Sequence, residues 1–246
     1  MNEHFSILVV GSGGTGTYFL KEISRFLSGN GAAAGMISNM IICDGDIVEE
    51  KNLSRQCFSS EDIGRKKAVV MAEILNLSFQ LNWAAYPKYL SDISDMDKFF
   101  QKNSKNVPVI IGCVDNHGAR LLMEDFFSKR RDCIYFDAAN EFSNGEAVFA
   151  YKADNMVFGP CRSYYFPDIL KGDTRNVTEI SCEELNQAEP QHILANMAAG
   201  MQLLSAFINL LNGKTTPGVT YFNPFEMYTE FVPYHNDLED REDECV

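Results

Sequence analysis

The sequence predicts an α/β fold of the Rossmann-like type: a mostly parallel sheet flanked by helices, with a C-terminal extension of mixed strands and one long helix. Short apolar runs alternate with helical segments over residues 5–139, which is the pattern of a parallel sheet with right-handed crossovers. A glycine-rich turn follows the first apolar run, and the rhythm changes after about residue 145. These observations place the parallel sheet in the first part of the chain.

Each element of that first part follows from its local pattern. Residues 5–10 form an apolar, β-rich run that ends at Gly11, and residues 15–27 carry Phe19, Ile23 and Leu27 on one helical face. Residues 28–35 are small and glycine-rich, which predicts a loop. The expected strands are 5–10, 36–43, 81–86, 107–114 and 133–139, and the expected helices are 15–27, 64–77, 94–102 and 118–128.

The second part is less regular. Residues 146–151 alternate like a strand, 155–184 are largely irregular, and 222–232 are mixed with one further strand. Residues 190–211 predict a long buried helix, because polar residues such as Asn196 and Gln202 interrupt their apolar run. With 246 residues, 46% of them hydrophobic, we expect one domain over residues 1–235 and a disordered acidic tail over 236–246.

The composition argues against several classes of partner. The formal net charge is −13 and the pI is near 4.7, so nucleic acid and anionic membrane surfaces are disfavoured. Seven scattered cysteines form no C-x-x-C pair, and the N-terminus lacks a signal-peptide pattern. We therefore expect reduced thiols and a cytoplasmic location.

The glycine-rich turn predicts a nucleotide site. Gly11, Gly13, Gly14 and Gly16 lie between a strand and a helix, where free backbone N–H groups and the helix dipole favour phosphate. Asp44 ends the second strand, where a carboxylate accepts hydrogen bonds from ribose hydroxyls. A tight turn without a ligand is the simpler alternative, and the turn alone leaves a dehydrogenase and an ATP-using enzyme equally open.

Three motifs decide between these readings. The first runs D-G-D-I-V-E-E-K-N-L-S-R-Q from Asp44, the second D-I-G-R-K-K from Asp62, and the third C-V-D-N-H-G-A-R from Cys113. Together they resemble the signature of the ThiF/MoeB/HesA family, which includes the adenylation domains of ubiquitin-activating enzymes. The motifs lie in the family's order on the predicted elements of residues 5–150.

The resemblance implies a ThiF-type adenylyltransferase: ATP-dependent adenylation of the C-terminal carboxylate of a small ubiquitin-like or sulfur-carrier protein ending in glycine. Such a reaction needs cations on the phosphates, supplied by Arg55 and Lys67, and a carboxylate for Mg²⁺, supplied by Asp115. Taken singly, the simpler interpretation of Arg55 or Lys67 is a solvated surface charge, and that of Asp115 with Asn116 is a cap for the following helix. The implied nucleotide-binding residues outside the glycine turn are Asp44, Asp46, Asn52, Arg55, Gln56 and Lys67.

The cysteines predict no structural zinc. Related enzymes often hold zinc with two C-x-x-C pairs, but the matching segment here has Tyr164 where the second cysteine of a pair stands. The resemblance also places a thiol near Cys182, which gives a thioester intermediate as a second step. Glu183 and Glu184 beside it oppose formation of the thiolate.

One departure from the family and two competing functions stay open. In the family, an arginine from an N-terminal helical segment reaches the ATP of the neighbouring protomer, whereas the first strand here starts at residue 5. The candidate substitutes are Arg25, Arg65 and Arg120. The family resemblance implies a homodimer. A catalytically weak nucleotide-binding subunit of a heterodimeric activating complex is the alternative function, and a nicotinamide or flavin oxidoreductase leaves the second half of the first motif unexplained.

Overall fold

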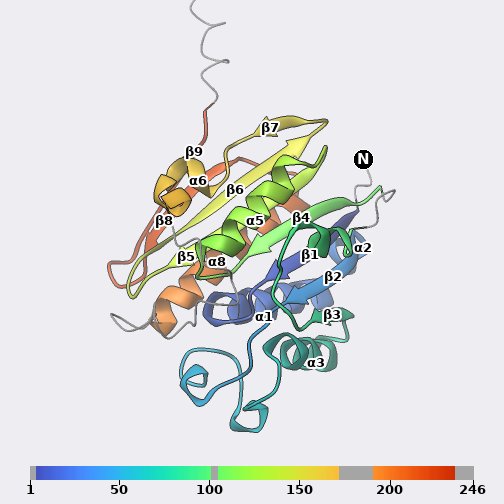
Figure 1. Ribbon diagram of the computed structural model, residues 1–246, viewed down its shortest axis with the longest axis vertical. Coiled ribbons are helices and arrows are strands. Elements are labelled where there is room, and N and C mark those ends of the chain that lie inside the picture. Colours follow the sequence, from blue (N-terminus) through green and yellow to red (C-terminus); the bar gives the residue numbers. More distant parts are fainter. Residues whose placement is uncertain (1–3, 101–104, 172–190, 236–246) are drawn as a thin grey trace, which may run out of the picture.

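One twisted sheet runs through the computed structural model, which describes residues 4–100, 105–171 and 191–235 (Figure 1). The strand order is β3-β2-β1-β4-β5-β6-β8-β9, with β7 paired to β6. The parallel strands are β1 (Phe5–Val10), β2 (Ile37–Cys43), β3 (Trp83–Tyr86), β4 (Val107–Gly112) and β5 (Cys133–Asn140). The antiparallel strands are β6 (Gly145–Ala153), β7 (Met156–Phe158), β8 (Gly218–Asn223) and β9 (Tyr228–Pro233). The predicted mostly parallel, Rossmann-like sheet with a mixed C-terminal extension is confirmed.

Helices cover both faces of this sheet (Figure 1). One face carries α1 (Gly14–Gly29), α3 (Lys67–Phe79) and α8 (Ile193–Leu211). The other carries α4 (Ile93–Asp97), α5 (His117–Ser128) and α6 (Arg162–Tyr165). The short elements are α2 (Gly31–Gly35), η1 (Glu50–Asn52), η2 (Ser60–Asp62) and η3 (Pro167–Lys171).

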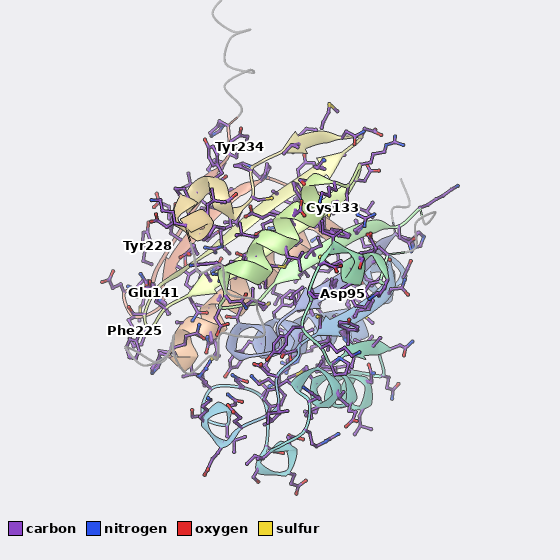
Figure 2. All side chains as sticks on the ribbon, viewed as in Figure 1. Asp95, Cys133, Glu141, Phe225, Tyr228 and Tyr234 are labelled. Atoms are coloured by element: carbon purple, nitrogen blue, oxygen red, sulfur yellow. The ribbon has the colours of Figure 1, made fainter. Side chains whose placement is uncertain are left out.

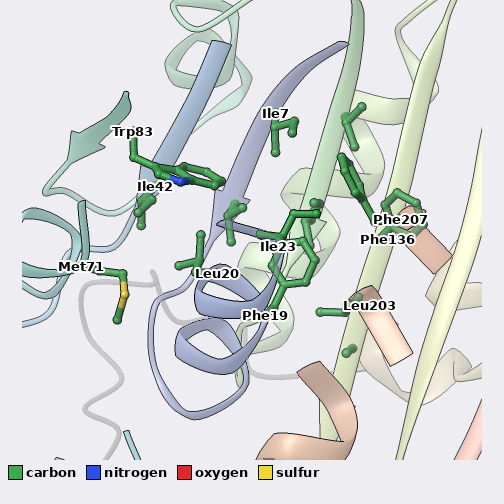
Figure 3. Close-up of a cluster of buried hydrophobic side chains, with 14 of the residues drawn as sticks. Ile7, Phe19, Leu20, Ile23, Ile42, Met71, Trp83, Phe136, Leu203 and Phe207 are labelled. Atoms are coloured by element: carbon green, nitrogen blue, oxygen red, sulfur yellow. The ribbon is translucent and has the colours of Figure 1, made fainter. Parts of the chain in front are cut away.

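The central strands are apolar on both faces because both faces are covered. In β1, Ile7 and Val9 pack toward α1 and α8, while Leu8 packs toward α5. Phe207 of α8 lies beside Phe19 and Phe136 in the first of these clusters (Figure 3). By length and composition alone α8 is apolar enough to span a membrane, but here one of its sides packs on α1 and β5.

The structure corrects four sequence-based boundaries. A short helix, α2, lies in the segment 28–35 expected to be a loop, because the Asn30 side chain accepts a hydrogen bond from the Ala33 N–H and starts it. The helix expected over 94–102 is the shorter α4, and the helix expected from residue 64 begins at Lys67. The irregular segment from residue 155 contains β7, α6 and η3.

Residues 222–232 contain the one further strand that was expected, β9, but the sequence analysis missed β8, which starts at Gly218 and forms a hairpin with it. Here β8 and β9 pair in antiparallel fashion. The Asn223 side chain accepts hydrogen bonds from the N–H groups of Phe225 and Glu226, and Met227 has a φ of 54°. An asparagine followed by proline is a turn signal, so the sequence contained the evidence for this reversal.

Candidate functional site

A cleft opens where the chain leaves the two central strands toward opposite edges of the sheet. Strands β1 and β4 are parallel neighbours, and their carboxyl ends form the crevice in which open α/β sheets bind ligands. The cleft has a volume of about 1310 Å³ and is lined by Gly11, Gly13 and Gly14. Gly11 has a φ of +94°, and a Cβ there would lie 2.5 Å from the carbonyl oxygen of Cys113. Only glycine fits this junction of the two strands.

The four glycines of the turn differ in what surrounds them. A Cβ on Gly13 would lie 3.7 Å from Gln56 Nε2, so this glycine faces open space in the cleft. A Cβ on Gly14 would lie 2.4 Å from Asn196 Oδ1. Gly16, expected to bind nucleotide, does not line the cleft. Its Cβ would lie 2.2 Å from the Gly11 carbonyl oxygen, so glycine is needed there to pack α1 against the turn.

Asp44 ties the glycine turn to the end of β2. Its Oδ2 accepts hydrogen bonds from the N–H of Ser12 at 2.7 Å and the Ser12 hydroxyl at 2.8 Å. Its Oδ1 accepts from the N–H of Asp46 at 2.9 Å. Burial raises the pKa of Asp44, although nearby Lys67 opposes this shift. Asp44, the residue predicted to bind ribose, therefore lines the cleft and also holds the glycine turn in place.

Asp46 and Lys67 form an ion pair beside Asp44. The Lys67 Nζ lies 3.0 Å from Asp46 Oδ2, and the Tyr89 hydroxyl also donates to Asp46. Burial alone would raise the pKa of Asp46, but Lys67 and Tyr89 outweigh it and lower this pKa below its usual value. We call Asp44, Asp46 and Lys67 the carboxylate wall of the cleft.

The opposite side of the cleft carries Arg55 among neutral amides. Arg55 Nη1 donates to Gln191 Oε1 at 3.2 Å, across 136 residues of chain. Gln191 Nε2 donates to the carbonyl oxygen of Asn140 at 3.1 Å, and Asn196 Nδ2 donates to Gln191 Oε1 at 3.0 Å. We call Arg55, Asn140 and Gln191, which line the cleft, the amide wall; Asn196 is buried behind it. Of these four residues only Arg55 was predicted from the sequence.

Two further amides predicted to bind phosphates, Asn52 and Gln56, also line the cleft and are buried. Asn52 Oδ1 accepts a hydrogen bond from the Glu49 N–H at 2.9 Å, which closes the turn of η1. Gln56 Oε1 is buried without a hydrogen-bond partner among the described residues. The Gln56 amide nitrogen lies toward Gly13, where a phosphate oxygen would accept from it.

Asp115 lies just after β4 and lines the same cleft. Its side chain is exposed, and within the described part of the chain it has no hydrogen bond or ion pair. Asn116, the next residue, caps α5 by accepting a hydrogen bond from the Ala119 N–H at 2.8 Å. The helix cap is therefore Asn116 alone, and the Asp115 carboxylate is available to a ligand. The structure thus brings Arg55, Lys67 and Asp115 into one cleft.

A buried ion cluster forms the floor of the cleft beyond Asp115. Arg162 of α6 donates to Asp137 and, at 2.6 Å, to Glu146 Oε1. Arg120 Nε lies 3.4 Å from Asp137 Oδ2, and Arg120 Nη2 donates to the Val114 carbonyl oxygen at 2.6 Å. Burial would lower the pKa of Arg162, but Asp137 and Glu146 raise it, so the guanidinium stays charged.

This cluster contains Arg120, one of the three candidate substitutes for the family's N-terminal arginine. Arg120 lines the cleft, whereas Arg25 and Arg65 do not. Arg25 is exposed and paired with Glu22, and Arg65 is exposed and paired with Glu73. Of the three candidates, Arg120 is the one that lines this chain's own cleft, but its side chain is buried and already held by Val114 and Asp137.

Aromatic side chains surround the end of the cleft near Glu141 and Phe142. Phe142 stacks on Phe225 with ring centroids 5.9 Å apart, and the His192 ring meets both edge-on. Glu141 and Phe225 lie at the same edge of the molecule (Figure 2). His192 Nδ1 accepts a hydrogen bond from the Leu194 N–H and so caps the start of α8.

Cys182 lies outside the described residues. Cys161, in the segment that resembles half of a zinc site, is half-buried, and burial raises the pKa of its thiol. Over residues 4–100, 105–171 and 191–235, no group of three or more His, Cys, Asp or Glu side chains is arranged to hold a metal ion. The expected lack of structural zinc stays a prediction.

The solved structures that resemble this chain share its fold. A crystal structure of E. coli MccB with ATP superposes with a TM-score of 0.65 at 14% identity, covering 94% of this chain and 64% of that one. A structure of PaaA gives a TM-score of 0.62 at 12% identity, covering 93% of this chain and 72% of the other. At these identities the likeness shows the fold alone.

Curated relatives are closer in sequence. The adenylyltransferase and sulfurtransferase UBA4 of Meyerozyma guilliermondii is 26% identical over 230 residues, covering 90% of this chain and 47% of the relative. The adenylyltransferase and sulfurtransferase MOCS3 of Mus musculus is 29% identical over 164 residues, covering 66% and 32%. The ubiquitin-activating enzyme E1 1 of Arabidopsis thaliana is 29% identical over 140 residues, covering 54% and 12%. The chain spans less than half the length of each of these relatives.

The sequence profile of the ThiF family matches residues 2–246, nearly the whole chain. That match agrees with the strand order, with the glycine turn between β1 and α1, and with the cleft that gathers Arg55, Lys67 and Asp115. This chain belongs to the ThiF family.

Proposed function

We propose that this chain uses ATP and Mg²⁺ to adenylate the C-terminal carboxylate of a small ubiquitin-like or sulfur-carrier protein ending in glycine. The observation that carries the proposal is the convergence of Arg55, Lys67 and Asp115 on one cleft above the glycine turn. The names of the relatives support it, because UBA4 and MOCS3 are adenylyltransferases and MccB is a structural neighbour solved with ATP.

The reaction joins a carboxylate to a nucleotide. An oxygen of the acceptor carboxylate attacks the α-phosphorus of ATP, the bond from that phosphorus to the bridging oxygen breaks, and pyrophosphate leaves. Negative charge gathers on the α-phosphate and on the leaving group, so fixed cations lower the barrier. Arg55 offers two parallel N–H donors to phosphate oxygens, and Lys67 offers a point charge.

The surrounding residues would position the nucleotide. Backbone N–H groups at Gly13 and the start of α1 suit the phosphates, and Asp44 at the end of β2 suits the ribose hydroxyls. Asp115 fits Mg²⁺, because its carboxylate is a hard oxygen ligand that has no partner within the described ranges of the chain. When bound, Mg²⁺ would neutralise charge on the phosphate oxygens.

Two finer steps belong to the same proposal. The acceptor tail would enter past the aromatic end of the cleft at Phe142 and Phe225, where the rings pack against its chain. The acyl adenylate would then be attacked by the Cys182 thiolate, which forms a thioester and releases AMP. We also propose a homodimer, to be tested by light scattering of the purified protein.

Exchange of labelled pyrophosphate into ATP, in the presence of small proteins ending in Gly-Gly from neighbouring genes, tests the adenylation step. We expect exchange with one such acceptor, its loss in Asp115→Ala, and its retention in Asp125→Ala, a control that removes an exposed carboxylate of α5 paired with Lys129. A dithiothreitol-sensitive adduct lost in Cys182→Ala tests the thioester.

The negative outcomes separate the candidate functions. ATP binding without exchange for every acceptor would favour the catalytically weak subunit of a heterodimeric complex. Tight NADH binding that ATP does not displace would overturn the proposal in favour of an oxidoreductase.

A further inference from the structure

Gln191 is the side chain that contacts Arg55, and its own amide is held in one orientation. Its Oε1 accepts from Arg55 Nη1 at 3.2 Å and from Asn196 Nδ2 at 3.0 Å. Its Nε2 donates to the carbonyl oxygen of Asn140 at 3.1 Å. Rotating the amide by 180° would place an NH₂ group against two donors and an oxygen against a carbonyl, so the hydrogen bonds permit one orientation.

Asn196 fixes Gln191 relative to the glycine turn. Asn196 is wholly buried on the first turn of α8, directly behind Gly14. Its Nδ2 also lies 3.3 Å from Asn140 Oδ1, which accepts from the Thr15 hydroxyl at 2.8 Å. These bonds tie together α1, the end of β5 and α8. The position of Gln191 therefore depends on three elements that pack around the phosphate turn.

The contact leaves the charge of Arg55 intact. Gln191 is neutral, and among the described residues Arg55 has no carboxylate within ion-pair distance and no other hydrogen bond. Lys67, by contrast, lies 3.0 Å from the Asp46 carboxylate. A cation held by a neutral acceptor keeps its full attraction for phosphate, and holding it in place before binding avoids reorganisation during the reaction.

We propose that Gln191 is a positioning residue of the adenylation site: it aims the Arg55 guanidinium into the cleft without neutralising it. This inference rests on the proposed function, because it assigns Arg55 to the phosphates of ATP. It adds a residue from just before α8 to a site whose family motifs end with the first turn of α5. Asn196 supports the same contact from behind.

Two variants of Gln191 distinguish its effect on the orientation of Arg55 from its effect on the charge of Arg55. Gln191→Met keeps the length of the side chain and removes its hydrogen bonds, so we expect kcat of pyrophosphate exchange to fall about 10-fold with little change in KM for ATP. Gln191→Glu makes an ion pair with Arg55 and opposes the phosphates, so we expect KM and the Kd for ATP to rise about 10-fold or more. Gln202→Glu, the same charge change in the middle of α8, is the matched control and should leave both unchanged.

A double-mutant cycle with Arg55 distinguishes a positioning role of Gln191 from a merely structural one. If Gln191 acts through Arg55, then Gln191→Met causes little further loss in an Arg55→Ala background. An equal loss in both backgrounds would show a structural role and overturn the proposal. So would wild-type ATP affinity in Gln191→Glu.

Failure of the proposed function gives a different pattern. If wild-type protein binds ATP without exchange, adenylation fails, and the Kd of Gln191→Glu for ATP still decides whether Gln191 governs the charge of Arg55. If wild-type protein does not bind ATP at all, both proposals are overturned.

Discussion

The two walls of the cleft each hold one cation, and they hold it in opposite ways. On the carboxylate wall, Lys67 is 3.0 Å from a carboxylate oxygen of Asp46, with Asp44 next to it. On the amide wall, Arg55 is 3.2 Å from the side-chain oxygen of Gln191. The comparison shows that neighbouring side chains, and not residue type alone, set how much positive charge each cation offers to a phosphate.

The difference assigns distinct tasks to the two cations. Lys67 is paired with Asp46 and lies near Asp44, so part of its charge is already compensated before an anionic ligand arrives. Arg55 has the neutral side chain of Gln191 as its hydrogen-bond partner, so its charge is not compensated by that contact. Removing Lys67 therefore leaves the two carboxylates of one wall uncompensated, whereas removing Arg55 leaves the other wall neutral.

The largest expected effect tests this asymmetry. Lys67→Ala should lower kcat/KM for pyrophosphate exchange by about 10³-fold and Arg55→Ala by about 10²-fold, because only the first leaves uncompensated carboxylates beside the phosphates. Adding Asp46→Asn to Lys67→Ala should recover part of the loss by removing one of those charges. Equal losses in the two single variants, with no recovery in the double variant, would remove the distinction between the walls.

Alanine substitutions at Gly13 and Gly14 should have effects of intermediate size, one on ATP binding and the other on stability. Gly14→Ala would place a Cβ 2.4 Å from Asn196 Oδ1, whereas Gly13→Ala meets Gln56 Nε2 at 3.7 Å. We expect Gly14→Ala to lower the free energy of unfolding by about 1–3 kcal/mol, and Gly13→Ala to weaken ATP binding with little loss of stability. Urea unfolding measures stability, and ATP titration measures binding. If Gly13→Ala instead lowers stability and Gly14→Ala instead weakens ATP binding, then Asn196 does not pack directly behind the glycine turn.

The smallest effect is a difference in pH dependence. Burial raises the folded-state pKa of Asp44, so its contribution to stability is present below its unfolded pKa of about 3.9 and lost as the pH rises through the folded value. For Asp46 the lowered pKa gives the opposite sign: its contribution to stability is present above the unfolded pKa of about 3.9 and is lost as the pH falls through the lower folded value.

Removing Asp44 should therefore change how stability varies with pH. Between about pH 3 and about pH 7, the free energy of unfolding of wild type should fall relative to that of Asp44→Asn as the pH rises. The reason is that only wild type has to ionise a buried carboxyl group at this position. Gln191→Met on the amide wall removes no titratable group, so its free energy of unfolding should vary with pH as that of wild type does. Urea unfolding at each pH provides the measurement, and a gap of constant size for Asp44→Asn would contradict the burial argument.

The sequence by itself determined the parallel half of the fold and the residues that its strands carry to the cleft. The alternation of apolar runs and helical segments predicted β1, β2, β4 and β5 closely, because these patterns depend on residues near each other in the chain. Since the carboxyl ends of parallel strands meet at one edge, the motifs containing Arg55, Lys67 and Asp115 were expected together, and they line one cleft.

Only the tertiary structure decided which side chains face these residues. In the sequence Asn196 is merely a polar interruption of an apolar helix, and Gln191 and Asp137 belong to no motif. Their partners are set by how α8 packs across β5 and α1 and by how α6 inserts Arg162 beneath the cleft. Local patterns fix periodicity and turns, but the choice of a polar partner depends on packing between elements that are more than a hundred residues apart, as Arg55 and Gln191 are.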